Sequence, residues 1–261
     1  MIKKIYFYII LTIDIVSSGF CCDLGNKQYG GVCSVSQVSV PVVSEEMCAG
    51  ISTAIREIPL ELHGLSFFTG TDFGTPLVRS LTCSKWAHVG IVLRDSRKDM
   101  NDQTGWYHFQ AVGLPVVFGS WALKFGFSVQ VGPWLKEASV YKGGLSVRPL
   151  RYDVSEKKPT SATIKKFMSS VIGKPYKTNI LTLFKSVARY NTDFNQDSFF
   201  CSELVAHMFM EFGFLSKERL ASNYMPKDFS SEESLLFNGI SLGEEVVMAT
   251  PQDTPSGCYI S

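Results

Sequence analysis

The chain has 261 residues, a formal net charge of +1, and 45% hydrophobic against 19% charged residues. This length and composition allow a substantial core in one or two domains and exclude a wholly disordered chain. The near-neutral charge, with no basic field, argues against nucleic acid as a partner.

The N-terminus has the layout of a secretory signal. Lys3 and Lys4 precede an apolar run at 5–13, and the small residues at 16–19 offer a cleavage site. We therefore predict that residues 1–18 are a signal peptide and that the protein is secreted or lumenal. Asp14 places a charge at the end of the run, so a buried N-terminal strand or helix is the alternative. The run is too short to span a bilayer.

Cysteines concentrate in the next segment, residues 19–55, which we assign as a Cys-containing extension. If Cys201 is a free nucleophile, the other six are an even number that disulfides would use in an oxidising compartment. In a reducing compartment they would be small apolar residues. Their spacing does not match paired zinc ligands, and we predict no metal and no cofactor. The seven are Cys21, Cys22, Cys33, Cys48, Cys83, Cys201 and Cys258.

Residues 56–250 form the predicted working domain, and strand patterns come first. A helical turn at 77–82 is expected between the first two strands, and a Gly143–Gly144 turn between the last two. The tail at 251–261 is expected to be irregular. The expected strands are 65–68, 87–94, 106–112, 128–131 and 146–150.

Helical periodicity follows the strands. An apolar stripe runs from Ser161 to a stop at Gly173, and a second helix is expected at 179–190. A third helix begins close to Cys201, with Asp197 or Ser198 as its N-cap, and ends near residue 213. The pattern predicts an α+β fold, with an antiparallel sheet packed against a few helices.

Cys201 is the first candidate for chemistry, because the amide groups at a helix start favour a thiolate, the nucleophilic form of cysteine. Taken alone, a cysteine in an apolar helix is more often a core residue. The polar loop at 195–198 before it and a histidine on a candidate strand favour function. That histidine is His88, which shares a strand face with Gly90 and needs a polar partner there.

Further residues could complete such a site. Gln110, beside His108 on one face of the next strand, can accept the imidazole N–H, although it could equally be a surface residue. The Cys201 backbone N–H and the Tyr176 phenol could stabilise an oxyanion, but a tyrosine in a turn commonly just packs. His63, in an expected loop, and His207, on another side of the Cys201 helix, are weaker candidates.

The chain contains five short segments in a characteristic order and spacing, at 86–92, 109–113, 173–176, 200–205 and 222–229. Together they resemble the permuted papain-like amidases of the NlpC/P60 superfamily, which include YiiX-type and YebB-type proteins and poxvirus relatives. The resemblance implies a circularly permuted papain-like core in which histidine precedes cysteine. It implies Cys201 as nucleophile, His88 as base, Gln110 where many relatives have Glu, and Tyr176 near the oxyanion.

The function expected from the site and the resemblance is a cysteine-dependent hydrolase, an amidase or peptidase that forms a thioester intermediate. The expected substrates are peptides, peptidoglycan fragments or lipid-linked amides, with membrane or lipid association possible. One alternative is a thiol acyltransferase acting on lipid or amine substrates. Another is a binding module that keeps the fold without turnover, which the Gln at 110 makes credible. The sequence leaves the oligomeric state open.

Overall fold

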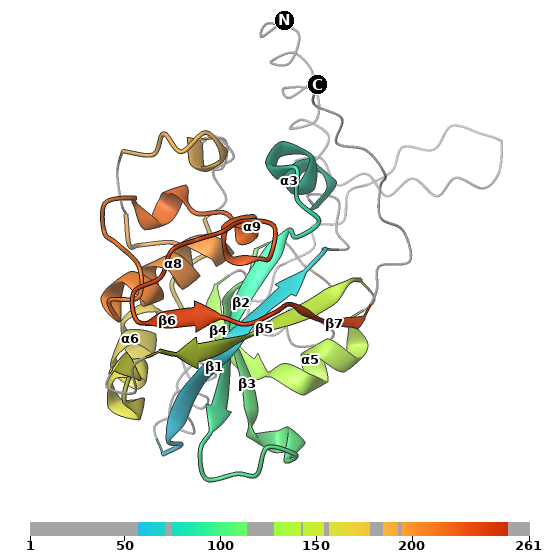
Figure 1. Cartoon of the computed structure of the whole chain (residues 1–261), viewed down its shortest axis with the longest axis vertical. Helices are drawn as coiled ribbons and strands as arrows, with labels where there is room; N and C mark the ends of the chain where they lie inside the picture. The colour runs from blue at the N-terminus through green and yellow to red at the C-terminus, as the bar shows by residue number, and fades with distance from the viewer. Residues whose placement is uncertain are drawn as a thin grey trace, which may run out of the picture. The chain divides into compact units, whose positions relative to one another are not determined.

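The computed structural model describes residues 57–70, 75–113, 128–153 except 142, 157–177, 185–192 and 195–249 (Figure 1). The predicted signal at 1–18, the extension at 19–55 and the tail at 251–261 lie outside the described residues. The expected helix at 179–190 also lies partly outside them, and its described part contains a helical turn at 185–187.

An antiparallel sheet of seven strands is the framework of the described residues. The strand order is β4-β3-β2-β1-β5-β6, and β7 also pairs with β5. Every strand pair is antiparallel, so the sheet and its helices have the expected α+β class. The strands are β1 (Leu60–Phe68), β2 (His88–Asp95), β3 (Trp106–Ala111), β4 (Val129–Pro133), β5 (Leu145–Tyr152), β6 (Ile240–Leu242) and β7 (Val246–Ala249).

β1 lies between β2 and β5 and is longer than the sequence pattern predicted. Only 65–68 was expected, because the apolar alternation changes phase inside the strand. Leu60 and Leu62 belong to the main core, and so do Leu65 and Phe67. A register shift between Leu62 and Gly64 in the pairing with β2 supplies the extra residue. Such a bulge moves the apolar residues from even to odd positions without changing the buried face.

Helices cover both faces of the sheet (Figure 1). On one face, α6 (Ser161–Val171) and α8 (Cys201–Glu211) pack over a large apolar core with the inward residues of β1, β2 and β3. On the other face, α5 (Trp134–Val140) accompanies a smaller cluster of Phe68, Tyr141 and Leu145. The candidate site involves both faces.

α6 confirms the expected stripe and stop. Thr160 caps its start by accepting a hydrogen bond from the Thr163 N–H, and the apolar residues from Ile164 to Val171 are buried. Gly173 follows with φ of 83°, a conformation that L-residues rarely adopt.

α8 is buried around its whole circumference from Cys201 to Met210. The sheet lies on one side, and the segment carrying η3 (Ala221–Asn223) and α9 (Pro226–Phe229) lies against it on another. Ser202 Oγ donates to the Tyr224 carbonyl at 2.7 Å and ties this segment to the first turn of the helix. Packing on every side therefore fixes the position of the helix start.

Several local predictions need correction. The turn at 77–82 is a complete helix, α3 (Thr75–Thr82). The predicted direct turn between the fourth and fifth strands is wrong, because α5 stands between them. His63 lies in β1 rather than in a loop, and packs edge-on against Trp106. In the described part of the chain, no helix is both long enough and apolar enough to cross a membrane.

Candidate active site

The thiol of Cys201 lies at the first residue of α8, as the sequence predicted, but the cap of the helix differs. Phe200 occupies the N-cap position in place of Asp197 or Ser198, and its side chain cannot accept a hydrogen bond. The Glu203 carboxylate instead accepts the Phe200 N–H at 3.1 Å. Glu203, the third residue of the helix, thus satisfies the backbone N–H of the N-cap residue, which is one of the two hydrogen bonds of a capping box.

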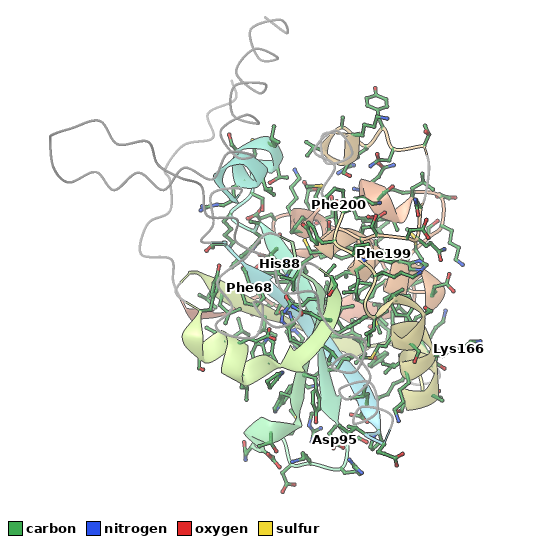
Figure 2. The ribbon with its side chains drawn as sticks, turned by 180° about the vertical axis from the view of Figure 1, so that it is seen from behind. Phe68, His88, Asp95, Lys166, Phe199 and Phe200 are labelled. Carbon is green, nitrogen blue, oxygen red and sulfur yellow. The ribbon has the colours of Figure 1, made fainter. Side chains whose placement is uncertain are left out.

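His88 is the first residue of β2, at the end of the sheet that the start of α8 reaches. It stands opposite Phe68 of β1 and hydrogen-bonds with the Cys201 thiol. Figure 2 shows His88 and Phe68 near the middle of the molecule and Asp95, at the other end of β2, far from them. The structure therefore brings together the cysteine and the histidine that the sequence proposed as partners.

The surroundings of Cys201 favour its thiolate. Burial by itself raises the pKa of this thiol, because a charge is poorly solvated in the interior. The charge and hydrogen bond of His88 act the other way, and so do backbone hydrogen bonds from Val89 and Ser202. The net effect lowers the pKa of Cys201 below its ordinary value. A lowered pKa increases the thiolate share of Cys201 at a given pH, and the thiolate is the nucleophilic form of cysteine.

Gln110, on the neighbouring strand β3, is a hydrogen-bond partner of the His88 ring. Its Oε1 atom is 2.7 Å from Nε2 of His88, and the amide is buried. A carbonyl oxygen only accepts, so Nε2 of His88 carries a proton and donates it to this bond. In the neutral ring the other nitrogen, Nδ1, then has no proton and can accept one. The structure thus places His88 in contact with both Cys201 and Gln110, and the catalytic roles of the three stay a prediction.

The hydrogen-bond chain continues beyond Gln110 to a residue that the sequence analysis did not single out. Gln110 Nε2 donates to Oε2 of Glu137 at 3.0 Å. The same oxygen lies 2.8 Å from Nδ1 of His108, whose Nε2 is 2.8 Å from Ser66 Oγ. All of these groups are buried. A continuous polar network therefore runs from the thiol into the α5 face of the sheet.

Two glycines make room for this network. A Cβ atom at Gly90 would lie 2.0 Å from Nε2 of His108, so the imidazole fits only because residue 90 has no side chain. A Cβ at Gly132 would lie 2.4 Å from Oε1 of Glu137. The carboxylate and the imidazole thus occupy space that any larger residue would fill.

Ser66, His108 and Glu137 have the connectivity of a serine-hydrolase triad, but no substrate can reach them. Ser66 and His108 are both 0% exposed. Their hydrogen bonds satisfy polar groups buried between the sheet and α5, as interior polar groups require. We therefore regard them as structural support for the Cys201 site.

Tyr176, the expected oxyanion donor, contacts Phe200, the residue just before Cys201. Its ring packs edge-on against Phe200, with centroids 5.8 Å apart, and a Cβ at Gly113 would lie 2.5 Å from the ring. A bridge between Tyr176 and Phe199 holds the backbone in place just before α8. The packing role is thus visible, and the oxyanion role stays a prediction.

The remaining chemical candidates are placed elsewhere. His207 packs between Phe167 and Phe199, away from the network. In the described part of the chain no three His, Cys, Asp or Glu side chains are grouped to hold a metal ion. Cys201 is a buried free thiol, Cys83 is exposed, and the five other cysteines lie outside the described residues.

The sequence analysis did not identify Glu137 because it did not predict α5, the helix that carries this residue. A seven-residue helix has too few turns for apolar periodicity, and its N-cap Pro133 makes no side-chain cap bond. The usable signal was Pro133 followed by the good helix formers Leu135, Glu137 and Ala138.

Comparison with known proteins adds little to this picture. No family model matches the chain, and no curated protein matches its sequence. Among solved structures, the chain is similar to the metalloprotein YiiX from Escherichia coli O157:H7, described as DUF1105. The identity is 15% and the TM-score 0.39, over 73% of this chain and 97% of YiiX. A likeness at this level does not establish a family.

Proposed function

We propose that this protein is a cysteine-dependent hydrolase acting on amides, with Cys201 as nucleophile, His88 as base and Gln110 as the residue that orients the imidazole. The observation that carries the proposal is the buried thiol at the start of α8, hydrogen-bonded to His88, whose Nε2 in turn bonds to Gln110. A nucleophile, a base and an orienting group joined in this order are the general kit for acyl transfer.

The first half of the reaction forms a thioester. Nδ1 of His88 takes the proton of Cys201, and the sulfur attacks the carbonyl carbon of the amide. The carbonyl oxygen becomes an oxyanion, for which the Cys201 backbone N–H at the helix start and the Tyr176 phenol are the proposed donors. When the intermediate collapses, the C–N bond breaks. The amine leaves with the proton held by His88, and the acyl group remains on the sulfur.

The second half regenerates the thiol. His88 removes a proton from a water molecule, which attacks the thioester carbon. The C–S bond breaks, the carboxylic acid departs, and the proton returns to the thiolate. Throughout, Gln110 accepts the Nε2–H of His88 and keeps Nδ1 directed at the sulfur. Because Gln110 is uncharged, it fixes the ring without itself neutralising an imidazolium.

A circularly permuted papain-like core is the fold that we propose for this site. Its support is the helix that presents a cysteine to the end of an antiparallel sheet, with the histidine strand earlier in the chain. Peptides, peptidoglycan fragments and lipid-linked amides are the substrate classes proposed on the resemblance. A secreted or lumenal location is proposed on the signal-like N-terminus.

The decisive experiment measures alkylation of each cysteine by iodoacetamide as a function of pH, read by peptide mass spectrometry. Cys201 should label faster than the exposed Cys83 at mildly acidic pH, because its pKa is lowered by His88. In His88→Ala this advantage should vanish, since burial alone raises the pKa of Cys201. The pH midpoint is the readout, because limited access changes the maximal rate but not the midpoint.

A pH midpoint for Cys201 labelling that is no lower than the midpoint for Cys83 in the wild type would contradict a nucleophilic thiol. A His88-dependent midpoint without turnover on a broad panel of amides would indicate the binding module instead. Product analysis with an added amine or alcohol acceptor would separate hydrolysis from acyl transfer. Transfer that outcompetes water would replace the hydrolase assignment.

A further inference from the structure

We propose that Glu137 is a positioning residue for the Cys201 site: through Gln110 it fixes the orientation of His88 and supplies the negative charge that stabilises the His88 imidazolium. This proposal rests on the proposed function. It adds a carboxylate to a set of three in which no member carries a permanent negative charge. The unit behind His88 is then Gln110 and Glu137 acting together.

The first part of the argument is the orientation of the Gln110 amide. Either end of a free glutamine amide could face His88, and the two ends would select opposite tautomers of the ring. Oε2 of Glu137 lies 3.0 Å from Gln110 Nε2, and an amide nitrogen can only donate. The carboxylate therefore turns the amide so that Oε1 faces His88. Without it, the amide could present its N–H₂ group to Nε2 and leave Nδ1 protonated toward the sulfur.

The second part is charge. When Cys201 transfers its proton, His88 becomes an imidazolium inside a buried site, where an unbalanced charge is costly. Glu137 is 6% exposed and stands one amide away from this ring. Electrostatic attraction at such a distance is weakly screened in the interior. A carboxylate there favours the thiolate–imidazolium pair over the neutral thiol and imidazole.

The other titratable groups around the site can be named from each packed element. β3 contributes His108, which shares Oε2 of Glu137. α8 contributes Glu203, which is ion-paired with Lys177 at 2.8 Å. Tyr141 packs against Phe68 on the α5 face, and Tyr176 packs against Phe200. Among these groups, Glu137 is the carboxyl that hydrogen-bonds to Gln110.

Glu137→Gln is the direct test. The amide oxygen of the new side chain can take the place of Oε2 and accept from both Gln110 and His108, so charge is the main loss. The pH midpoint for iodoacetamide labelling of Cys201 should rise by about one unit, which is about tenfold slower labelling on the acidic side. A merely structural role would lower the urea midpoint of unfolding and leave the labelling midpoint unchanged.

The swap Gln110→Glu/Glu137→Gln makes the test sharper. It moves the carboxylate one position closer, so that it accepts directly from His88 Nε2 while the new amide at position 137 donates to it. The labelling midpoint should return to the wild-type value or fall below it. Gln110→Glu alone should give an intermediate result, because two carboxyl groups at the 3.0 Å contact cannot both ionise easily.

Asp95→Asn is the matched control. Asp95 is also a buried carboxylate, but it lies at the far end of the His88 strand, seven residues and thus about 23 Å away, and it pairs with Arg97 (Figure 2). Its substitution should leave the labelling midpoint unchanged. Gly132→Ala is the second variant, because its Cβ would displace Oε1 of Glu137. This variant changes no residue of the hydrogen-bond network itself. It should raise the midpoint in the same direction.

The outcomes separate the two proposals. If His88→Ala shifts the labelling midpoint but Glu137→Gln and Gly132→Ala do not, Glu137 has no positioning role and the proposed function stands. If the labelling midpoint of the double variant Gln110→Glu/Glu137→Gln is as high as that of Glu137→Gln alone, the charge argument is wrong. If His88→Ala has the same labelling midpoint as the wild type, the proposed function itself fails. Should Glu137→Gln not fold, Gly132→Ala and the swap decide.

Discussion

At the scale of single residues, the site depends on a missing side chain as much as on its polar groups. His108 lies over Gly90, where a Cβ would stand 2.0 Å from the ring nitrogen that bonds to Ser66. A strand normally gains from a β-branched residue at such a position. Here glycine is required because the His108 imidazole from the neighbouring strand fills the space next to residue 90. This imidazole also hydrogen-bonds to Glu137.

Gly90→Ala should therefore destabilise the protein by about 2–3 kcal/mol, from overpacking and from the strained Ser66–His108 bond. Urea unfolding followed by circular dichroism measures this loss. Gly105→Ala is the matched control, because its Cβ would meet only the flexible side chain of Lys98. An effect at residue 90 no larger than that at residue 105 would show that His108 moves aside freely.

At the scale of elements, the start of α8 depends on a buried ion pair. Glu203 accepts the N–H of Phe200 and the ammonium group of Lys177, and both charged side chains are largely buried. Burial raises the pKa of Glu203, and the bonds to Lys177 and Phe200 offset only part of that rise. The helix that carries Cys201, the proposed nucleophile, is thus anchored by a charge from the segment before it.

Lys177→Met should destabilise the protein by about 3 kcal/mol, because it leaves a buried carboxylate without its cation. The sign of the pH dependence follows from the raised pKa of Glu203: the folded state holds that proton more tightly than the unfolded chain. Stability is then lost as the pH rises from the ordinary carboxyl pKa through the raised one. The loss in Lys177→Met should be larger at pH 8 than at pH 4.5 in urea unfolding.

Two further variants test the cause. Adding Glu203→Gln to Lys177→Met should recover most of the stability at pH 8, since no buried charge remains. Lys158→Met removes a cation from the exposed pair with Glu61 and should cost less than about 1 kcal/mol. A similar loss in Lys158→Met and Lys177→Met would mean that the buried pair has no special role.

At the scale of the whole described domain, Arg148 joins the C-terminal segment to the sheet. From β5 it donates hydrogen bonds to the carbonyl oxygens of Phe229, Leu242 and Gly243, at 2.8, 3.2 and 2.9 Å. These carbonyls come from the end of α9 and the end of β6. One side chain thus holds together parts of the chain that no short-range pattern connects.

Arg148→Met should lower the free energy of unfolding by about 2–4 kcal/mol, because it leaves three carbonyl groups without their donor. Amide hydrogen exchange should speed up between residues 229 and 243, while the labelling midpoint of Cys201 stays unchanged. Arg151→Met, an exposed arginine on the same strand, is the control and should be close to neutral. Exchange that stays at the wild-type rate in Arg148→Met would contradict this anchoring.

Local patterns predicted much of this framework. The helix stripe before Gly173, the helix start at Cys201, the strand that carries His88 and the shared face of His108 and Gln110 all follow from short-range preferences of the backbone. The failures occur where tertiary contacts override those preferences. A bulge hid the first half of β1, and α5 is too short to show a period.

By itself, the sequence determined which side chains are available for chemistry and which local elements carry them, because dihedral preferences and apolar spacing act over a few residues. Only the tertiary structure decided that Gln110 presents its oxygen to His88 and that Glu137, 27 positions along the chain, turns it that way. It also decided that the pKa of Cys201 falls despite burial. Strand register and helix packing set these distances, and electrostatic and hydrogen-bond energies depend on distance rather than on separation along the chain.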